Sequence, residues 1–203
     1  MDYIVKERIV RYIRPDEVYS KKVIKEICKE FPFLIPKNDL DYDYTFLQLE
    51  IPIGWYNLFL QMCGDIKYVL EKYNLIDVFE FEQVKEKWGG LRCYYSFGFN
   101  HDSGCSKEIQ DILYKYEYMA KLVCTRCGDA ATYTTCNGWV SPYCDKCINS
   151  LEYLTEDILS KIKSKFSVSF YEFAADDKKR FEKTLSFEDE WNRYKNLIKT
   201  KSE

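Results

Sequence analysis

Cys124-Thr125-Arg126-Cys127-Gly128 decides the fold of this chain, together with Cys144-Asp145-Lys146-Cys147 further along. Each stretch is a C-x-x-C pair, and sixteen residues separate the two pairs, which lies within the spacing typical of a four-thiolate zinc site. A structural zinc ion takes four ligands in a tetrahedron. The spacing therefore predicts one structural Zn2+ held by Cys124, Cys127, Cys144 and Cys147. Four buried thiols or two disulfides are the alternatives that spacing leaves open.

The residues around the two pairs predict a treble-clef-like module. Gly128 allows the left-handed backbone that closes a tight turn around a metal. Asn137-Gly138 lies between two strand-like runs and predicts a hairpin. The second pair opens a helical pattern whose apolar residues recur every three or four positions: Ile148, Leu151, Leu154, Ile158 and Ile162.

Nine cysteines in 203 residues, with no signal peptide and no apolar run of membrane-spanning length, predict a reducing, cytoplasmic location and no membrane partner. The cysteines outside the pairs are expected to be small buried hydrophobes: Cys28, Cys63, Cys93, Cys105 and Cys136. Because Cys136 lies inside the zinc module, it is an alternative zinc ligand in place of one of the four cysteines. The formal net charge of −3 argues against a global basic field for nucleic acid, although a local patch would suffice.

The order of expected elements predicts an α+β fold, in which a β-hairpin and helices pack with the zinc module. We expect a strand-and-helix extension over 1–53, a helix-hairpin-helix core over 54–123, the zinc module over 124–163, and a strand and helix over 164–203. Strands are expected over 3–13, 45–49 and 166–170. Helices are expected around Val23–Phe31, after Gly54, after Ser106 as N-cap, and from near Ser186. No linker composition precedes the first knuckle, so the module is expected to dock on the rest.

The run from Val78 to Phe97 predicts a hairpin whose two-residue turn is Gly89-Gly90. Pairing outward from that turn sets Trp88 opposite Leu91, Glu86 opposite Cys93 and Val84 opposite Tyr95 on a mostly apolar face. The other face sets Lys87 opposite Arg92 and Lys85 opposite Tyr94. This second face, which we call the basic patch, consists of Lys85, Lys87, Arg92 and Tyr94. Its residue types suit a protein partner or phosphates and a stacked base. A solvated face neutralised by nearby glutamates is the alternative.

The stretch Lys87-Trp88-Gly89-Gly90-Leu91-Arg92-Cys93-Tyr94 resembles the K-[FW]-G-G-L-R-[FC]-Y signature of a family of small, uncharacterised phage and bacterial proteins. Members of that family look alike in layout: a Gly-Trp helix (here Gly54-Trp55), this hairpin, a helix, a C-x-x-C-G knuckle, a Gly-Trp strand (Gly138-Trp139) and a second cysteine motif. The resemblance covers roughly 54–147 and implies a phage or mobile-element setting. Accessory phage proteins of this size often bind or inhibit host machinery, so a host protein such as a CRISPR-type defence nuclease is the expected target.

Few residues offer catalysis. His101 is the only histidine. Its neighbour in sequence, Cys105, is a candidate thiolate, but a solvated loop histidine is the favoured interpretation. Four thiolates leave zinc no open position for water, and the sequence lacks the glutamate and P-C-x-x-C halves of a zinc deaminase. Asp77 with Gln83-Val84-Lys85 loosely resembles a magnesium-dependent nuclease pattern. We therefore expect a binding protein and not an enzyme, with a nucleic-acid-binding zinc module and a nuclease as alternatives.

Overall fold

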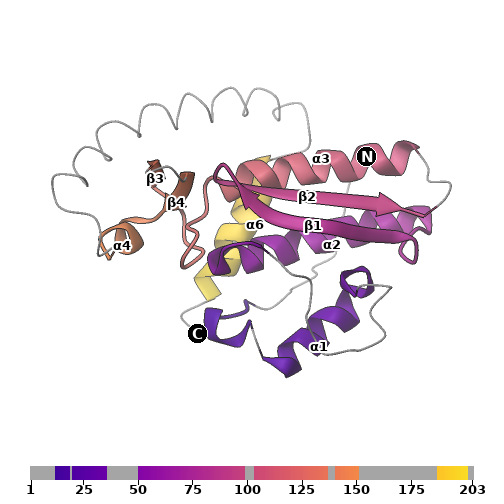
Figure 1. Cartoon of the computed structure of the whole chain (residues 1–203), viewed down its shortest axis with the longest axis horizontal. Helices are drawn as coiled ribbons and strands as arrows, with labels where there is room; N and C mark the ends of the chain where they lie inside the picture. Colours follow the sequence, from indigo (N-terminus) through magenta and orange to yellow (C-terminus); the bar gives the residue numbers. More distant parts are fainter. Residues whose placement is uncertain are drawn as a thin grey trace.

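The computed structural model describes residues 12–18, 20–35, 50–98, 103–136, 140–150 and 187–200. Helices combine with two antiparallel strand pairs, so the predicted α+β class is confirmed. The elements in chain order are α1 (Lys21–Glu30), α2 (Tyr56–Tyr73), β1 (Phe79–Lys87), β2 (Gly90–Phe97), α3 (Ser103–Ala120), β3 (Tyr133–Cys136), β4 (Val140–Tyr143), α4 (Asp145–Ile148) and α6 (Phe187–Lys199). Figure 1 shows α3 alongside β2, with β3, β4 and α4 gathered at the end where α3 finishes. No helix in these ranges is long and apolar enough to cross a bilayer.

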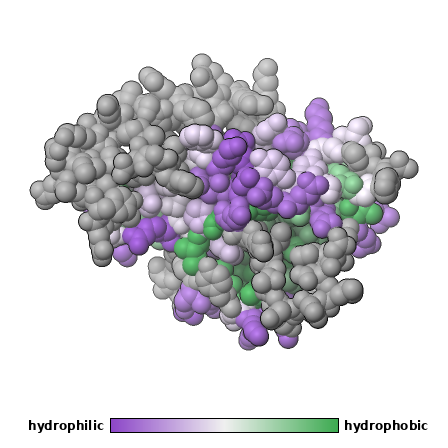
Figure 2. All heavy atoms as spheres, viewed as in Figure 1, coloured by the Kyte–Doolittle hydropathy of each residue, from purple (hydrophilic) through white to green (hydrophobic). Residues whose placement is uncertain are grey.

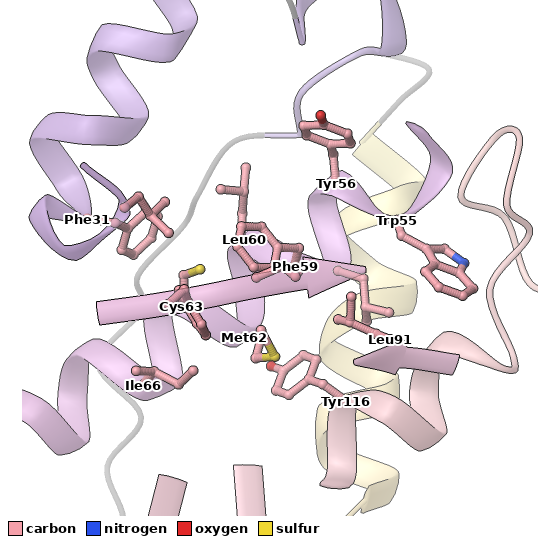
Figure 3. Close-up of a cluster of buried hydrophobic side chains, with 14 of the residues drawn as sticks. Phe31, Trp55, Tyr56, Phe59, Leu60, Met62, Cys63, Ile66, Leu91 and Tyr116 are labelled. Carbon is pink, nitrogen blue, oxygen red and sulfur yellow. The ribbon is translucent and has the colours of Figure 1, made fainter. Parts of the chain in front are cut away.

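The main buried cluster forms around α2, in which every residue from Tyr56 to Cys63 is buried. Trp55, just before the helix, and Phe59 and Met62 within it are fully buried, and burial of one such side chain contributes about 1.5–3 kcal/mol. Figure 3 shows α2 side chains beside Tyr116 of α3 and Leu91 of β2. The same cluster takes residues from α1, the hairpin and α6. Segments from 1–53, 54–123 and 164–203 therefore share one core.

The hairpin of β1 and β2 turns one residue earlier than predicted. Lys87 pairs with Gly90, and Lys85 pairs with Arg92, so the turn residues are Trp88 and Gly89. Both have positive φ, 56° and 71°, as a type I′ turn requires. The predicted Gly89-Gly90 turn was wrong, and with it the predicted pairs Trp88–Leu91, Glu86–Cys93, Val84–Tyr95, Lys87–Arg92 and Lys85–Tyr94.

Tertiary packing explains the misplaced turn. A Cβ on Gly90 would lie 3.2 Å from Cγ of Glu117 on α3, which is closer than most real Cβ contacts. The absence of a side chain at Gly90 therefore lets strand β2 lie close to helix α3. Sequence reasoning assigned this glycine to the turn because glycine also favours positive φ.

The predicted division of the hairpin into two faces is confirmed, because the pairing shifted by two and preserved the alternation. Val84 and Leu91 are buried, while Lys87 and Tyr94 are exposed. A register shift between Phe81 and Gln83 is a β-bulge, which adds one residue to β1. The bulge lets Phe79 and Phe81 face the core together with Val84. Trp88, placed by prediction on the apolar face, instead lies exposed at the turn.

Two further helices match the prediction. In α1, Val23, Ile24 and Ile27 are buried. In α6, Tyr194 is buried and Trp191 and Ile198 pack against the core. The third helix differs: α3 begins at Ser103, so the prediction of Ser106 as N-cap was wrong. The expected strands over 45–49 and 166–170, nearly all of the one over 3–13, and the helical run beyond Ile148 lie outside the described residues.

Candidate metal centre

The four predicted cysteines meet in space. The Sγ atoms of Cys124, Cys127, Cys144 and Cys147 all lie within 4.8 Å of one another. Those of Cys127 and Cys144 are 3.6 Å apart. Four sulfurs at about 2.3 Å from a tetrahedral zinc would be about 3.8 Å apart, whereas a disulfide requires about 2.05 Å. All four cysteines are free of disulfides, and their arrangement fits one metal ion.

Each cysteine pair lies on a turn that directs both sulfurs to the same point. At the first pair, the N–H of Gly128 donates to the carbonyl of Cys124 over 3.0 Å, and Gly128 has a φ of 78° that suits glycine. At the second pair, Cys144 precedes α4, and the N–H of Ile148 donates to its carbonyl over 3.0 Å. The positive φ at Gly128 confirms the turn expected there.

The strand pair β3–β4 connects the two knuckles. β3 and β4 are antiparallel, and Cys136 pairs with Val140. Thr125 in the first knuckle donates its N–H and its Oγ1 to the carbonyl of Pro142 in β4, over 3.0 and 3.2 Å. The order of knuckle, hairpin and short cysteine-bearing helix is the predicted treble-clef-like arrangement. The Asn137-Gly138 turn and the Cys136 side chain lie outside the described part of the chain.

The electrostatics of the cluster favour a bound cation. A hydrogen bond from Cys127, assisted by backbone N–H groups of the knuckle, lowers the pKa of Cys124 to about 4. That same hydrogen bond to Cys124, together with burial, raises the pKa of Cys127. Burial raises the pKa of Cys147 to about 11. Four thiolates this close repel one another, so all four ionise together only around a positive ion.

The first knuckle rests directly on the start of α2. The N–H of Gly54 donates to the carbonyl of Thr125 over 2.9 Å, and a Cβ on Gly54 would lie 2.2 Å from the carbonyl oxygen of Cys124. The buried Trp55 donates its Nε1–H to the carbonyl of Val123 over 2.9 Å. The cysteine module is therefore docked on the core, as predicted. The contact itself was not predicted, although Gly54-Trp55 was noted as a motif.

The same knuckle is held from a second side by α6. The buried hydroxyl of Tyr194 donates to the carbonyl of Gly128 over 2.8 Å. The residue before Tyr194 in α6, Arg193, donates a hydrogen bond to Asp65 of α2 over 2.8 Å. Asp65 also accepts a hydrogen bond from the hydroxyl of Tyr116 in α3, over 2.8 Å. The sequence did not predict this contact of Tyr194, because the carbonyl that accepts from its hydroxyl lies 66 residues away in the chain.

The basic patch lies on the outer face of the hairpin, where Figure 2 shows hydrophilic side chains gathered. Arg92 makes a 2.7 Å ion pair with Glu117 of α3. The ammonium of Lys85 lies 5.4 Å from the centre of the Tyr94 ring, a cation–π contact. Lys87 is exposed. Arg92 is thus neutralised within the chain, whereas no carboxylate among the described residues forms an ion pair with Lys85 or Lys87.

The nuclease pattern does not assemble. Asp77 precedes β1 and is exposed, while Lys85 lies six residues into the strand after Phe79. At about 3.3 Å per residue, Lys85 lies about 20 Å along the strand from Phe79, whereas Asp77 lies before the strand begins, so the two are not placed to share one magnesium ion. Gln83 instead donates to Glu50 over 3.4 Å. His101 lies outside the described residues. Among the residues described, the four-cysteine cluster is the only group with metal-ligand geometry.

Comparison with protein-family models found no match, and neither did comparison with curated proteins or with solved structures. The family resemblance of the hairpin motif therefore stays a prediction.

Proposed function

We propose that the chain is a zinc-stabilised binding protein that acts without catalysis. Zn2+ is the ion we assign to the cluster, because four thiolates in a near-tetrahedral set suit zinc among the common divalent ions. A zinc ion with four protein ligands has no position for water or substrate. Its role is to fix the knuckle against which Gly54 and Tyr194 pack.

The observation that carries the binding role is the outer face of the hairpin. Exposed aromatic and cationic side chains stand together there, on strands fixed by the core beneath them. Tyrosine, tryptophan and arginine are the residue types enriched where proteins bind one another. Within the described ranges, the four cysteines are the one group of His, Cys, Asp or Glu side chains placed to hold a metal ion.

The partner we propose is a host protein, which this chain binds and inhibits, and a defence nuclease is the class we favour. The motif resemblance supports a phage setting, where small accessory proteins often act in this way. Nucleic acid is the second candidate, because lysines beside an exposed aromatic ring also suit a backbone phosphate and a stacked base. The ion pair of Arg92 with Glu117 and the formal net charge of −3 favour the protein.

An affinity pull-down from host lysate, with and without nuclease treatment, tests this proposal. Zinc-loaded protein is the bait, and mass spectrometry identifies what is retained. A Lys85→Glu/Arg92→Glu variant is expected to lose the partner, and Lys22→Glu/Lys107→Glu is the control with the same charge change on exposed helix positions. One protein retained after nuclease treatment supports the proposal. Recovery that vanishes with the nucleic acid would favour the second candidate.

A further inference from the structure

Trp88 is held in an unusual position at the tip of the hairpin. Its φ is 56°, in the left-handed region that bulky residues rarely adopt. Two-residue turns of this type usually carry Asn, Asp or Gly there. Its side chain is also 69% exposed, more than Tyr68 at 51% or Tyr94 at 45%. The positive φ strains the backbone, and the exposed ring contributes little burial energy, so neither feature favours folding. Backbone strain of this kind concentrates at functional sites.

The strained turn is fixed in place by its surroundings. The N–H of Gly89 donates to Oε1 of Glu86 over 2.8 Å. The next residue, Gly90, lies against Glu117 of α3, and β1 and β2 pair up to the turn. The backbone that carries the Trp88 ring is therefore already ordered before a partner arrives, so binding loses little backbone entropy there.

The charged side chains on the outer face of β1 are arranged by sign along the strand that leads to Trp88. Lys87 adjoins Trp88, and among the described residues no carboxylate lies within ion-pair distance of its ammonium. The ammonium of Lys85 lies 5.4 Å from the centre of the Tyr94 ring, and no carboxylate among the described residues forms an ion pair with it. At the far end of β1 lie Glu80 and Glu82, of which Glu82 is the bulged residue. Along the outer face of β1, the lysines therefore lie toward the tip and these two glutamates toward the other end of the strand.

We propose that Trp88 is the anchor of the binding surface, and that it inserts into an apolar pocket on a protein whose pocket rim is acidic. Lys85 and Lys87 would face the carboxylates of that rim, and Tyr94 would extend the apolar contact. Buried tryptophan anchors surrounded by polar contacts dominate the energy of many protein interfaces. The acidic residues farther along β1 would repel a nucleic-acid backbone that followed the strand. This inference rests on the proposed function and assigns its central residue and the chemistry of the partner's site.

Trp88→Asn is the variant that tests the anchor. Asparagine tolerates positive φ, and Asn-Gly is a favoured turn of this type, so the hairpin is expected to fold at least as well. Tyr68→Ser is the control, because it removes an exposed aromatic side chain from α2. The probe is a phage-displayed library of random 12-residue peptides, selected on zinc-loaded wild-type protein. Selected peptides are then synthesised and their affinities measured by fluorescence anisotropy.

The expected peptides carry apolar residues flanked by Asp or Glu, and bind wild type and Tyr68→Ser alike. Trp88→Asn is expected to weaken them at least tenfold, and Lys85→Glu/Lys87→Glu to weaken them several-fold. Failure to enrich peptides that distinguish wild type from Trp88→Asn would overturn the inference. So would a fluorescent single-stranded dT20 that binds wild type but not Trp88→Asn, with affinity falling log-linearly with salt. If the host-lysate partner is retained equally by Trp88→Asn, the proposed function stands and the anchor is wrong.

Discussion

Replacing Gly54 by alanine tests whether the first cysteine knuckle packs tightly against the start of α2. The added Cβ would lie 2.2 Å from the carbonyl oxygen of Cys124 and 2.8 Å from the nitrogen of Gly128. Real Cβ atoms essentially never approach other atoms this closely, and both neighbours are backbone. The knuckle must therefore move away from the start of α2.

The expected effect is large for a single methyl group. Overpacking of a close contact costs about 1–3 kcal/mol, and stretching the hydrogen bond from Gly54 to Thr125 costs about 1 kcal/mol more. The free energy of unfolding should thus fall by about 2–4 kcal/mol in Gly54→Ala. Because the displaced knuckle carries two of the ligands, part of the loss should appear as weaker zinc binding, about tenfold for each 1.4 kcal/mol.

Urea denaturation of the zinc-loaded protein measures the first quantity, and competition with a chromophoric chelator measures the second. Gly64→Ala is the matched control. That glycine lies inside α2, and no atom lies within 4 Å of the place an added methyl group would take, so alanine should stabilise the helix by about 0.5–1 kcal/mol. If Gly54→Ala unfolds within about 0.5 kcal/mol of wild type and binds zinc equally well, the account of the docked knuckle is wrong.

Four further substitutions have definite expected outcomes. Tyr194→Phe leaves a knuckle carbonyl without its buried donor and should lower the free energy of unfolding by about 1–3 kcal/mol, seen by urea titration. Cys127→Ser should abolish stoichiometric zinc binding, while Cys28→Ser, outside the cluster, should keep one zinc per chain by elemental analysis. Asp65→Asn weakens the network that holds α6; a loss of about 1.5–3 kcal/mol should accompany faster amide exchange in α6 than in β1. Trp88→Asn relieves the strained turn and should raise Tm by about 2–4 °C, corresponding to about 1 kcal/mol.

Each of these outcomes can be contradicted. A Tyr194→Phe protein as stable as wild type would mean that the α6 contact contributes nothing. Retention of one zinc by Cys127→Ser would remove that residue from the ligand set. Uniform exchange in Asp65→Asn would show that the network does not hold α6 in particular, and a lower Tm for Trp88→Asn would show that the turn is not strained by tryptophan.

The metal-binding role of the four cysteines was predictable because it depends on the local spacing of each pair. A C-x-x-C turn places two sulfurs together without reference to the rest of the chain, and Gly128 supplies the backbone conformation that closes it. The two faces of the hairpin were predictable for a similar reason, since side chains alternate along a strand.

Long-range packing was not predictable from the same patterns. Gly90 was assigned to the turn because glycine favours positive φ, yet it pairs with Lys87 in the strand ladder and lies close to Glu117 on another helix. The β-bulge after Phe81 depends on how the aromatic side chains pack below the strand. A contact such as Tyr194 to Gly128 joins residues that no periodicity relates.

X-ray absorption at the zinc K-edge tests the central claim most directly. Purified protein should contain one zinc ion per chain, and its first coordination shell should consist of four sulfur atoms at about 2.3 Å. A first shell with nitrogen or oxygen in place of one or more sulfurs, or protein that folds fully without zinc, would contradict the closed structural site on which this account rests.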